Sequence, residues 1–264
     1  MSKITVAVSG ACGRMGREVC RAVLEDNQLE LVGALDVENK GKDIGIIVAG
    51  KELGLPVEEL TEEFLKYRAP MVMVDFSTPL SVRSNTDLAI SCGVRPVVGT
   101  TGLASEDLER WGSLLKEAGL GGIIAPNFAL GAVLMMKFSA LAARYLPQAE
   151  IIELHHDNKI DAPSGTAIKT AEMIAGGREK EPAEKEELLK LQGARGGVKN
   201  GIHIHSVRLN GLIAHQEVIF GGTGQTLTIR HDSYDRRSFM PGVILAVKKV
   251  IQVEGLIYGL DNLI

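Results

Sequence analysis

Hydrophobic residues in the first half of the chain form short continuous runs, separated by segments with helical spacing. The runs KITVAVSG, LELVGALD and MVMVDFS, at residues 3–10, 29–36 and 71–77, are typical of buried parallel strands. The segments between and after them continue the alternation, with helices predicted at 14–26, 79–91 and 105–119 and strands at 95–100 and 121–127. Strands separated by helices imply right-handed βαβ units and a doubly wound parallel sheet.

The second half of the chain has a different pattern, because its last strands are not separated by helices. A helix is predicted at about 129–146, a strand at 149–156 and another helix from Ser164. Short turns link the three strands that follow and indicate an antiparallel sheet; these strands are expected at residues 202–209, 214–221 and 226–233. An apolar helix at about 238–252 is expected to pack back on the first domain.

This change of pattern predicts an α/β chain with two domains. We expect the parallel sheet in a first domain at residues 1–127 and 237–264, and a smaller α+β domain at residues 128–236. The segment 178–200 is charged and rich in glycine, so we expect a solvated, mobile loop there.

Composition and charge exclude several classes of protein. A formal net charge of -4 argues against a general nucleic-acid binder, and no apolar run approaches the roughly 20 residues that span a bilayer. The cysteines Cys12, Cys20 and Cys92 have no CxxC spacing, which argues against a disulfide scaffold or a zinc ribbon. The chain begins with a strand-like run rather than a targeting segment. We therefore expect a cytoplasmic protein without nucleic-acid or membrane partners.

A glycine-rich turn joins the first predicted strand to the first predicted helix. Gly10, Gly13 and Gly16 in GACGRMG allow a tight turn and a close approach of the backbone to a pyrophosphate at the helix N-terminus. The spacing is GxxGxxG rather than GxGxxG, so an ordinary glycine-rich turn is the alternative. Asp36, however, ends the second strand, where dinucleotide-binding domains place the acid that binds ribose. Together these features predict a Rossmann-type domain that binds NADH, NADPH or both.

Two further loops follow later strands of the predicted parallel sheet. They are GTTG at residues 99–102 and PNF at residues 126–128. Ligands of open α/β sheets bind at the carboxyl ends of the strands, so these loops can meet the nicotinamide end of the cofactor. Plain turn chemistry is the alternative for either loop taken alone.

The stretch HHDNKIDAPSGTA, residues 155–167, places nitrogen bases just before a helix start. Pro163 and Ser164 suit a helix N-terminus, and the N–H groups of Gly165 and Thr166 would point outward toward a carboxylate. Lys159 lies in the connecting loop, where an ammonium group suits an anionic substrate. Histidine side chains in general can exchange protons near neutral pH, so His155 could act as an acid or a base.

Two simpler explanations of this stretch remain open. A metal site would need a third ligand, and adjacent histidines chelate poorly, so we expect no metal. A helix cap with incidental histidines would explain the Ser-Gly-Thr sequence but not the three nitrogen bases beside it.

The extended motif ELHHDNKIDAPSGTA resembles the signature of the 4-hydroxy-tetrahydrodipicolinate reductase (dihydrodipicolinate reductase) family of the diaminopimelate and lysine pathway. The resemblance covers the whole chain, because VSGACGRMG, DFSTP, VVGTTG and APNFALG fall in the order of the family. It implies an NAD(P)H-binding domain, a substrate domain with an open mixed sheet, and a homotetramer joined through that sheet.

The resemblance also implies roles for individual residues. His155 would be the catalytic acid or base, and Lys159 a proton donor or a charge partner of the substrate. His156 would contact the substrate, while Gly165 and Thr166 would bind one of its carboxylates. The residues that would line the cofactor are Gly10, Ala11, Cys12, Gly13, Arg14, Met15, Asp36, Gly99, Thr100, Thr101, Ala125, Pro126, Asn127 and Phe128.

The expected activity is the NAD(P)H-dependent reduction of 4-hydroxy-tetrahydrodipicolinate, a cyclic dicarboxylate, to tetrahydrodipicolinate with loss of water. One alternative is another imino-acid reductase or amino-acid dehydrogenase of the same fold, to which a carboxylate site would also be suited. A regulator that senses dinucleotides without turnover is a second alternative, although it would not need His155 and Lys159.

Overall fold

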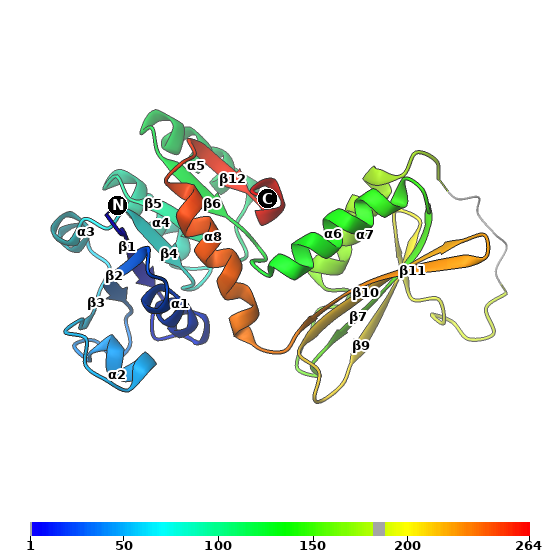
Figure 1. Ribbon diagram of the computed structural model, residues 1–264, viewed down its shortest axis with the longest axis horizontal. Coiled ribbons are helices and arrows are strands. Elements are labelled where there is room, and N and C mark those ends of the chain that lie inside the picture. The colour runs from blue at the N-terminus through cyan, green and yellow to red at the C-terminus, as the bar shows by residue number, and fades with distance from the viewer. Residues whose placement is uncertain (1, 182–187) are drawn as a thin grey trace. The chain divides into compact units, whose positions relative to one another are not determined.

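The computed structural model describes residues 2–181 and 188–264. The chain divides into two compact units, one formed by Met1–Phe128 with Phe239–Ile264 and the other by Ala129–Ser238 (Figure 1). The chain therefore leaves the first unit once and returns to it once.

The first unit is built on a seven-stranded sheet in which every pair of neighbouring strands is parallel. The strand order is β12-β6-β5-β4-β1-β2-β3. The strands are β1 (Ile4–Ser9), β2 (Leu29–Leu35), β3 (Val57–Glu58), β4 (Val72–Asp75), β5 (Arg95–Val98), β6 (Gly121–Ile124) and β12 (Gly255–Tyr258). The order reverses direction between β1 and β4, and this reversal marks the ligand crevice of a doubly wound sheet.

Helices cover both faces of this sheet. They are α1 (Arg14–Glu25), α2 (Ile44–Ala49), α3 (Glu62–Arg68), α4 (Val82–Ser91), α5 (Ser105–Glu117) and α8 (Met240–Val250). Helices α1 and α8 contact each other, as do α4 and α5, and the right-handed crossovers place these two pairs on opposite faces. Trp111 and Leu115 of α5 are fully buried, and each such side chain contributes roughly 1.5–3 kcal/mol of stability.

The second unit is a five-stranded mixed sheet with two helices. The strand order is β11-β10-β7-β9-β8. The elements are α6 (Leu130–Ala143), β7 (Gln148–His155), α7 (Gly165–Gly177), β8 (Gly197–Lys199), β9 (Ile202–Arg208), β10 (Ala214–Gly222) and β11 (Gln225–Ser233). Alternate residues of β7 such as Ile151 and Glu153 are buried, whereas those between them are partly exposed. The chain returns to the first unit through a 3₁₀ turn, η1 (Arg236–Phe239), and the C-terminal residues form a second, η2 (Leu260–Asn262).

The expectation of an antiparallel sheet over residues 202–233 is confirmed for β10 and β11, which pair antiparallel, but is wrong for β9. Strand β9 pairs in parallel with β7, and β7 lies between β9 and β10. The reason is the helix between β7 and β9, which makes this connection a βαβ crossover, while the short turn after β9 leads β10 to the opposite edge of β7. The mixed sheet that the family resemblance implies is confirmed.

Several short elements were not predicted from the hydrophobic pattern. These are helices α2 and α3 and strands β3, β8 and β12. Within the charged segment 178–200, residues 182–187 lie outside the described residues, and Gly197–Lys199 form the edge strand β8 rather than a loop. Elements of two to seven residues show too few periods to be recognised from spacing.

Candidate active site

The glycine loop after β1 is shaped for a close backbone approach. The N–H groups of Gly10 and Ala11 both donate to the carbonyl oxygen of Leu35, and Gly10 adopts a φ of 75°. A Cβ atom at Gly16 would lie 1.9 Å from the carbonyl oxygen of Gly10, so only glycine fits there. Helix α1 begins directly after Gly13 without a side-chain cap. Its first N–H groups therefore remain available to an anion.

Asp36 lies beside this loop, at the carboxyl end of β2. Its Oδ2 atom accepts a hydrogen bond from the backbone N–H of Cys12 at 2.8 Å, and Oδ1 accepts one from Glu38 at 3.0 Å. The loop and the acid predicted from the sequence are thus in direct contact. An acid beside an uncapped helix N-terminus fits the ribose and pyrophosphate of a nicotinamide dinucleotide.

Within the loop, the predicted cofactor residues differ in exposure. Ala11 and Cys12 are buried, and burial raises the pKa of the Cys12 thiol. Gly13 and Arg14 are exposed, and Met15 is half-buried. Ala11 and Cys12 can therefore offer a ligand mainly their backbone.

The later loops meet at the same edge of the sheet. Gly99 donates its backbone N–H to the carbonyl oxygen of Asp75, and Ala125 donates to that of Val98. Phe128 is buried against Phe76, with ring centroids 5.8 Å apart. Of the other predicted residues in these loops, Thr101 and Pro126 are exposed, and Asn127 is half-buried.

A buried carboxylate that the sequence analysis missed connects these strand ends. Asp75 is fully buried at the end of β4. Its Oδ1 atom accepts hydrogen bonds from the hydroxyl groups of Ser77 and Thr100 at 2.7 and 3.0 Å, and Oδ2 accepts one from Asn85 at 2.9 Å. Asn85 also donates to the hydroxyl of Ser9, at the end of β1. Asp75 thereby fixes the position of Thr100, one of the predicted cofactor residues.

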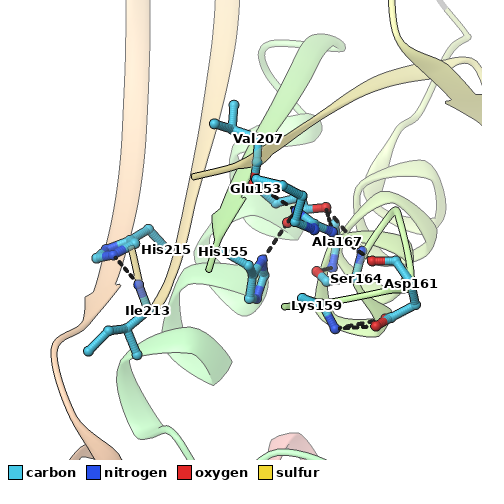
Figure 2. Close-up of polar contacts among 10 residues, drawn as sticks. Glu153, His155, Lys159, Asp161, Ser164, Ala167, Val207, Ile213 and His215 are labelled. Carbon is cyan, nitrogen blue, oxygen red and sulfur yellow. Dashed lines mark hydrogen bonds and ion pairs between the residues drawn. The ribbon is translucent and has the colours of Figure 1, made fainter. Parts of the chain in front are cut away.

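In the second unit, His155 is the last residue of β7 and shares a strand face with Glu153. Its Nδ1 atom lies 2.5 Å from Oε2 of Glu153 (Figure 2). Glu153 is fully buried and also pairs with both terminal nitrogens of Arg208, on the neighbouring strand β9, at 2.8 Å each. Burial opposes the ionisation of Glu153, but the hydrogen bonds from His155 and Arg208 outweigh it and lower its pKa to about 2.

The loop after β7 carries the remaining predicted residues. Lys159 lies in this loop, as expected, and its Nζ atom donates to both carboxylate oxygens of Asp161 at 2.7 Å (Figure 2). The hydrogen bond from Lys159 holds the pKa of Asp161 below its usual range. His156 lies just beyond the end of β7 and is exposed.

The predicted cap at the start of α7 is present. Ser164 accepts a hydrogen bond from the backbone N–H of Ala167 at 3.2 Å through its hydroxyl, and its own N–H points to Oε1 of Glu153 at 3.3 Å. Gly165 is exposed and Thr166 half-buried in the first turn of the helix. One buried glutamate therefore contacts both His155 and the residue that begins the candidate carboxylate site.

Two family models match the chain over nearly its whole length. "Dihydrodipicolinate reductase, N-terminus" matches residues 4–128, and "Dihydrodipicolinate reductase, C-terminus" matches residues 131–264. The chain belongs to the dihydrodipicolinate reductase family. The family resemblance inferred from the sequence motifs is thus confirmed, and with it the Rossmann-type parallel sheet beside a second, mixed-sheet domain.

Individual relatives of the dihydrodipicolinate reductase family match from end to end. The chain is 55% identical over 261 residues to a 4-hydroxy-tetrahydrodipicolinate reductase of Listeria welshimeri, covering 98% of this chain and 99% of the relative. It is 52% identical over 264 residues to one of Desulfitobacterium hafniense, covering 99% of both. A solved structure of dipicolinate-bound dihydrodipicolinate reductase from Paenisporosarcina sp. TG-14 has a TM-score of 0.88 and 47% identity, over 99% of this chain and 100% of that one.

Among residues 2–181 and 188–264, no three histidine, cysteine or acidic side chains are grouped so that they could hold a metal ion. In the same residues, no helix has both the length and the apolar character of a membrane span.

Proposed function

We propose that this chain reduces 4-hydroxy-tetrahydrodipicolinate to tetrahydrodipicolinate with loss of water, using NADH or NADPH. The observation that carries the proposal is the group formed by His155, Glu153 and the start of α7. A buried carboxylate there holds a histidine at the end of β7 and also contacts Ser164, the N-cap of α7, whose first residue Gly165 is exposed. A proton-exchanging group beside an anion-binding helix N-terminus suits the reduction of a carboxylate-bearing substrate.

The first unit would hold the cofactor. The backbone of Gly10–Met15 would bind the pyrophosphate at the start of α1, and Asp36 would accept hydrogen bonds from ribose hydroxyls. Residues 99–101 and 125–128 would lie along the nicotinamide end. When bound, the nicotinamide supplies the hydride. The loops at the carboxyl ends of β4 and β5 would keep their positions beside the cofactor, because Asp75 accepts hydrogen bonds from Ser77 and Thr100.

The second unit would hold the substrate. Gly165 and Thr166 would bind one carboxylate at the N-terminus of α7, and His156 would be a further contact. Lys159 would exchange its ion pair with Asp161 for one with the substrate. His155 would hold or deliver the proton that goes to the electron-rich ring carbon next to the carbon that accepts the hydride. The dipicolinate in the Paenisporosarcina structure is a cyclic dicarboxylate and supports this class of substrate.

Assembly and location form part of the same proposal. A homotetramer joined through the sheet of the second unit is proposed from the family resemblance. A cytoplasmic location is proposed because Cys12, Cys20 and Cys92 are all free thiols, as is usual in a reducing compartment.

The test is substrate-dependent oxidation of NADH. The purified chain is mixed with NADH, and absorbance is followed before and after addition of the freshly made condensation product of aspartate semialdehyde and pyruvate. Oxidation that begins only on this addition supports the proposal. Equal oxidation with a simple imino acid would favour a general imino-acid reductase, and binding of NADH without any turnover would favour a dinucleotide sensor.

A further inference from the structure

Glu153 is a buried carboxylate that joins three segments around the candidate site. It accepts hydrogen bonds from His155 on its own strand, from both terminal nitrogens of Arg208 on β9, and from the N–H of Ser164 before α7. Acidic side chains are rarely buried completely unless they are paired. The pairing here is unusually complete, because donors reach both carboxylate oxygens.

The ionisation of Glu153 determines which ring nitrogen of His155 carries a proton. The pKa of Glu153 is lowered to about 2, so at neutral pH its carboxylate is ionised and can only accept hydrogen bonds. The nitrogen that faces it, Nδ1 of His155, must therefore be the donor. The other nitrogen, Nε2, is then the one that can gain or lose a proton while Nδ1 stays protonated.

Arg208 extends this arrangement to the loop that carries Lys159. Its Nη2 atom donates to the carbonyl oxygen of Asp161 at 2.7 Å as well as to Glu153. The side chain of Asp161 in turn binds Lys159. One buried ion pair thus fixes both the histidine ring and the loop.

We propose that Glu153 is a positioning residue that holds His155 with Nδ1 protonated, so that Nε2 exchanges the proton with the substrate. In the direction of reduction, the N–H bond at Nε2 breaks and its electron pair stays on the imidazole. The proton goes to the electron-rich carbon of the substrate. The proposal rests on the proposed catalytic role of His155. It adds the orientation of the ring, the identity of the reacting nitrogen and the charge that stabilises the protonated ring.

A second histidine on the sheet provides a matched control. Glu150 lies three residues before Glu153 and so faces the opposite side of β7. It binds Nε2 of His205 at 2.8 Å and both terminal nitrogens of Arg195 at 2.6 and 3.1 Å. This is the same combination of glutamate, histidine and arginine, but outside the candidate site. Glu150→Gln therefore removes a similar charge without touching His155.

The first experiment measures the pH dependence of kcat for the wild type, Glu153→Gln and Glu150→Gln, with the oligomeric state of each checked. Removing the charge at Glu153 destabilises the protonated ring, so the loss of activity at high pH should begin about one pH unit lower. At neutral pH, kcat should fall about 10- to 100-fold, comparable to the loss when the carboxylate partner of a metal-binding histidine is removed. Glu150→Gln should keep the wild-type pH dependence. A Glu153→Gln enzyme with a wild-type pH profile overturns the proposal.

The second experiment needs no change at Glu153 and holds even if that variant fails to fold. Long-range ¹H–¹⁵N spectra of protein labelled in its six histidines report the tautomer of each neutral ring, and the signal missing from His155→Gln identifies His155. A neutral ring protonated at Nδ1 supports the proposal, and one protonated at Nε2 overturns it. This result does not depend on turnover. If His155→Gln keeps full activity, the proposed function of His155 fails, whichever tautomer is found.

Discussion

Asp36 and Cys12 are joined by a hydrogen bond from the backbone N–H of Cys12 to Oδ2 of Asp36, 2.8 Å long, that ties the end of β2 to the glycine loop. Because the second oxygen, Oδ1, accepts a hydrogen bond from the backbone N–H of Glu38, the Asp36 carboxylate is held in one orientation. An acid fixed here accepts hydrogen bonds from a ribose 2′-hydroxyl and repels a 2′-phosphate.

This geometry predicts use of both cofactors with a preference for NADH. The next residue, Val37, is exposed and carries no charge, while Lys40 and Lys42 are bound by Glu59 and Asn39. Such exposed contacts are worth less than about 1 kcal/mol, so the lysines can turn toward a phosphate. Steady-state kcat/KM with each cofactor checks this. A preference for NADPH of more than about 100-fold, roughly 2.7 kcal/mol, would contradict it.

Val37→Arg should change the ratio of kcat/KM with NADH to kcat/KM with NADPH about tenfold in favour of NADPH, which corresponds to about 1.4 kcal/mol. The added guanidinium would lie next to Asp36, where a 2′-phosphate has no fixed cationic partner within the described loop. Val37→Gln, which adds length without charge, is the matched control and should leave the ratio unchanged. An equal shift in both variants would show that charge is not the cause.

The long elements of the fold and the glycine loop could be predicted from the sequence, because each depends on local spacing. The pairing of β9 with β7 could not, since it is set by the crossover through α7 rather than by the strands themselves. In the same way, Glu153 appears in the sequence as a polar residue between apolar ones. Its partner Arg208 is 55 residues away, and no local pattern connects them.

Asp75 was missed for a related reason. An apolar run that ends in an acid looks like an ordinary strand end, and only the folded sheet brings Ser77, Asn85 and Thr100 around its carboxylate. The available signal was the position itself, because carboxyl ends of parallel strands border the ligand crevice.

Asp75→Ala should lower the free energy of unfolding by about 2–4 kcal/mol, because it leaves buried donors without an acceptor. It should also weaken NADH binding about tenfold, since Thr100 and the loop around it lose their anchor. Asp75→Asn keeps one oxygen that can accept from Ser77 and Thr100. It should therefore lose less unfolding free energy and less NADH affinity than Asp75→Ala. Chemical denaturation and a fluorescence titration with NADH measure the two effects. Unchanged NADH affinity in Asp75→Ala would show that the network is not needed at the cofactor loop.

The low pKa of Glu153 predicts a specific dependence of stability on pH. Its pKa falls from an ordinary 4.5 to about 2 in the folded protein, so its stabilising contribution is complete above about pH 4.5 and is lost as the pH falls toward 2. This pKa shift corresponds to about 3 kcal/mol of folding free energy at neutral pH. The difference in unfolding free energy between the wild type and Glu153→Gln should therefore shrink as the pH falls from about 5 toward 2. Urea denaturation at several pH values measures it, and a pH-independent difference would contradict the assignment.

Thr166→Val tests the carboxylate site at the start of α7. The substitution keeps the shape of the side chain but removes a hydroxyl donor, and the carboxylate carries the same charge in the ground state and the transition state. The loss should therefore appear as a rise in KM of about tenfold with little change in kcat. A fall in kcat with unchanged KM would mean that Thr166 acts on the reacting atoms instead.

His155→Gln and Lys159→Met separate proton transfer from the binding of charge. Gln removes the acid or base but keeps a polar side chain beside Glu153, so kcat should fall about 10²- to 10⁴-fold if the proton step limits the rate. Met removes the ammonium that forms the ion pair with Asp161, so it should lower kcat and raise KM together. NADH affinity measured without substrate should hardly change in either variant, because the cofactor residues Gly10–Met15 and Asp36 belong to the other unit. Near-normal kcat in both variants would mean that the segment 155–167 is a helix cap and that the chemistry takes place elsewhere.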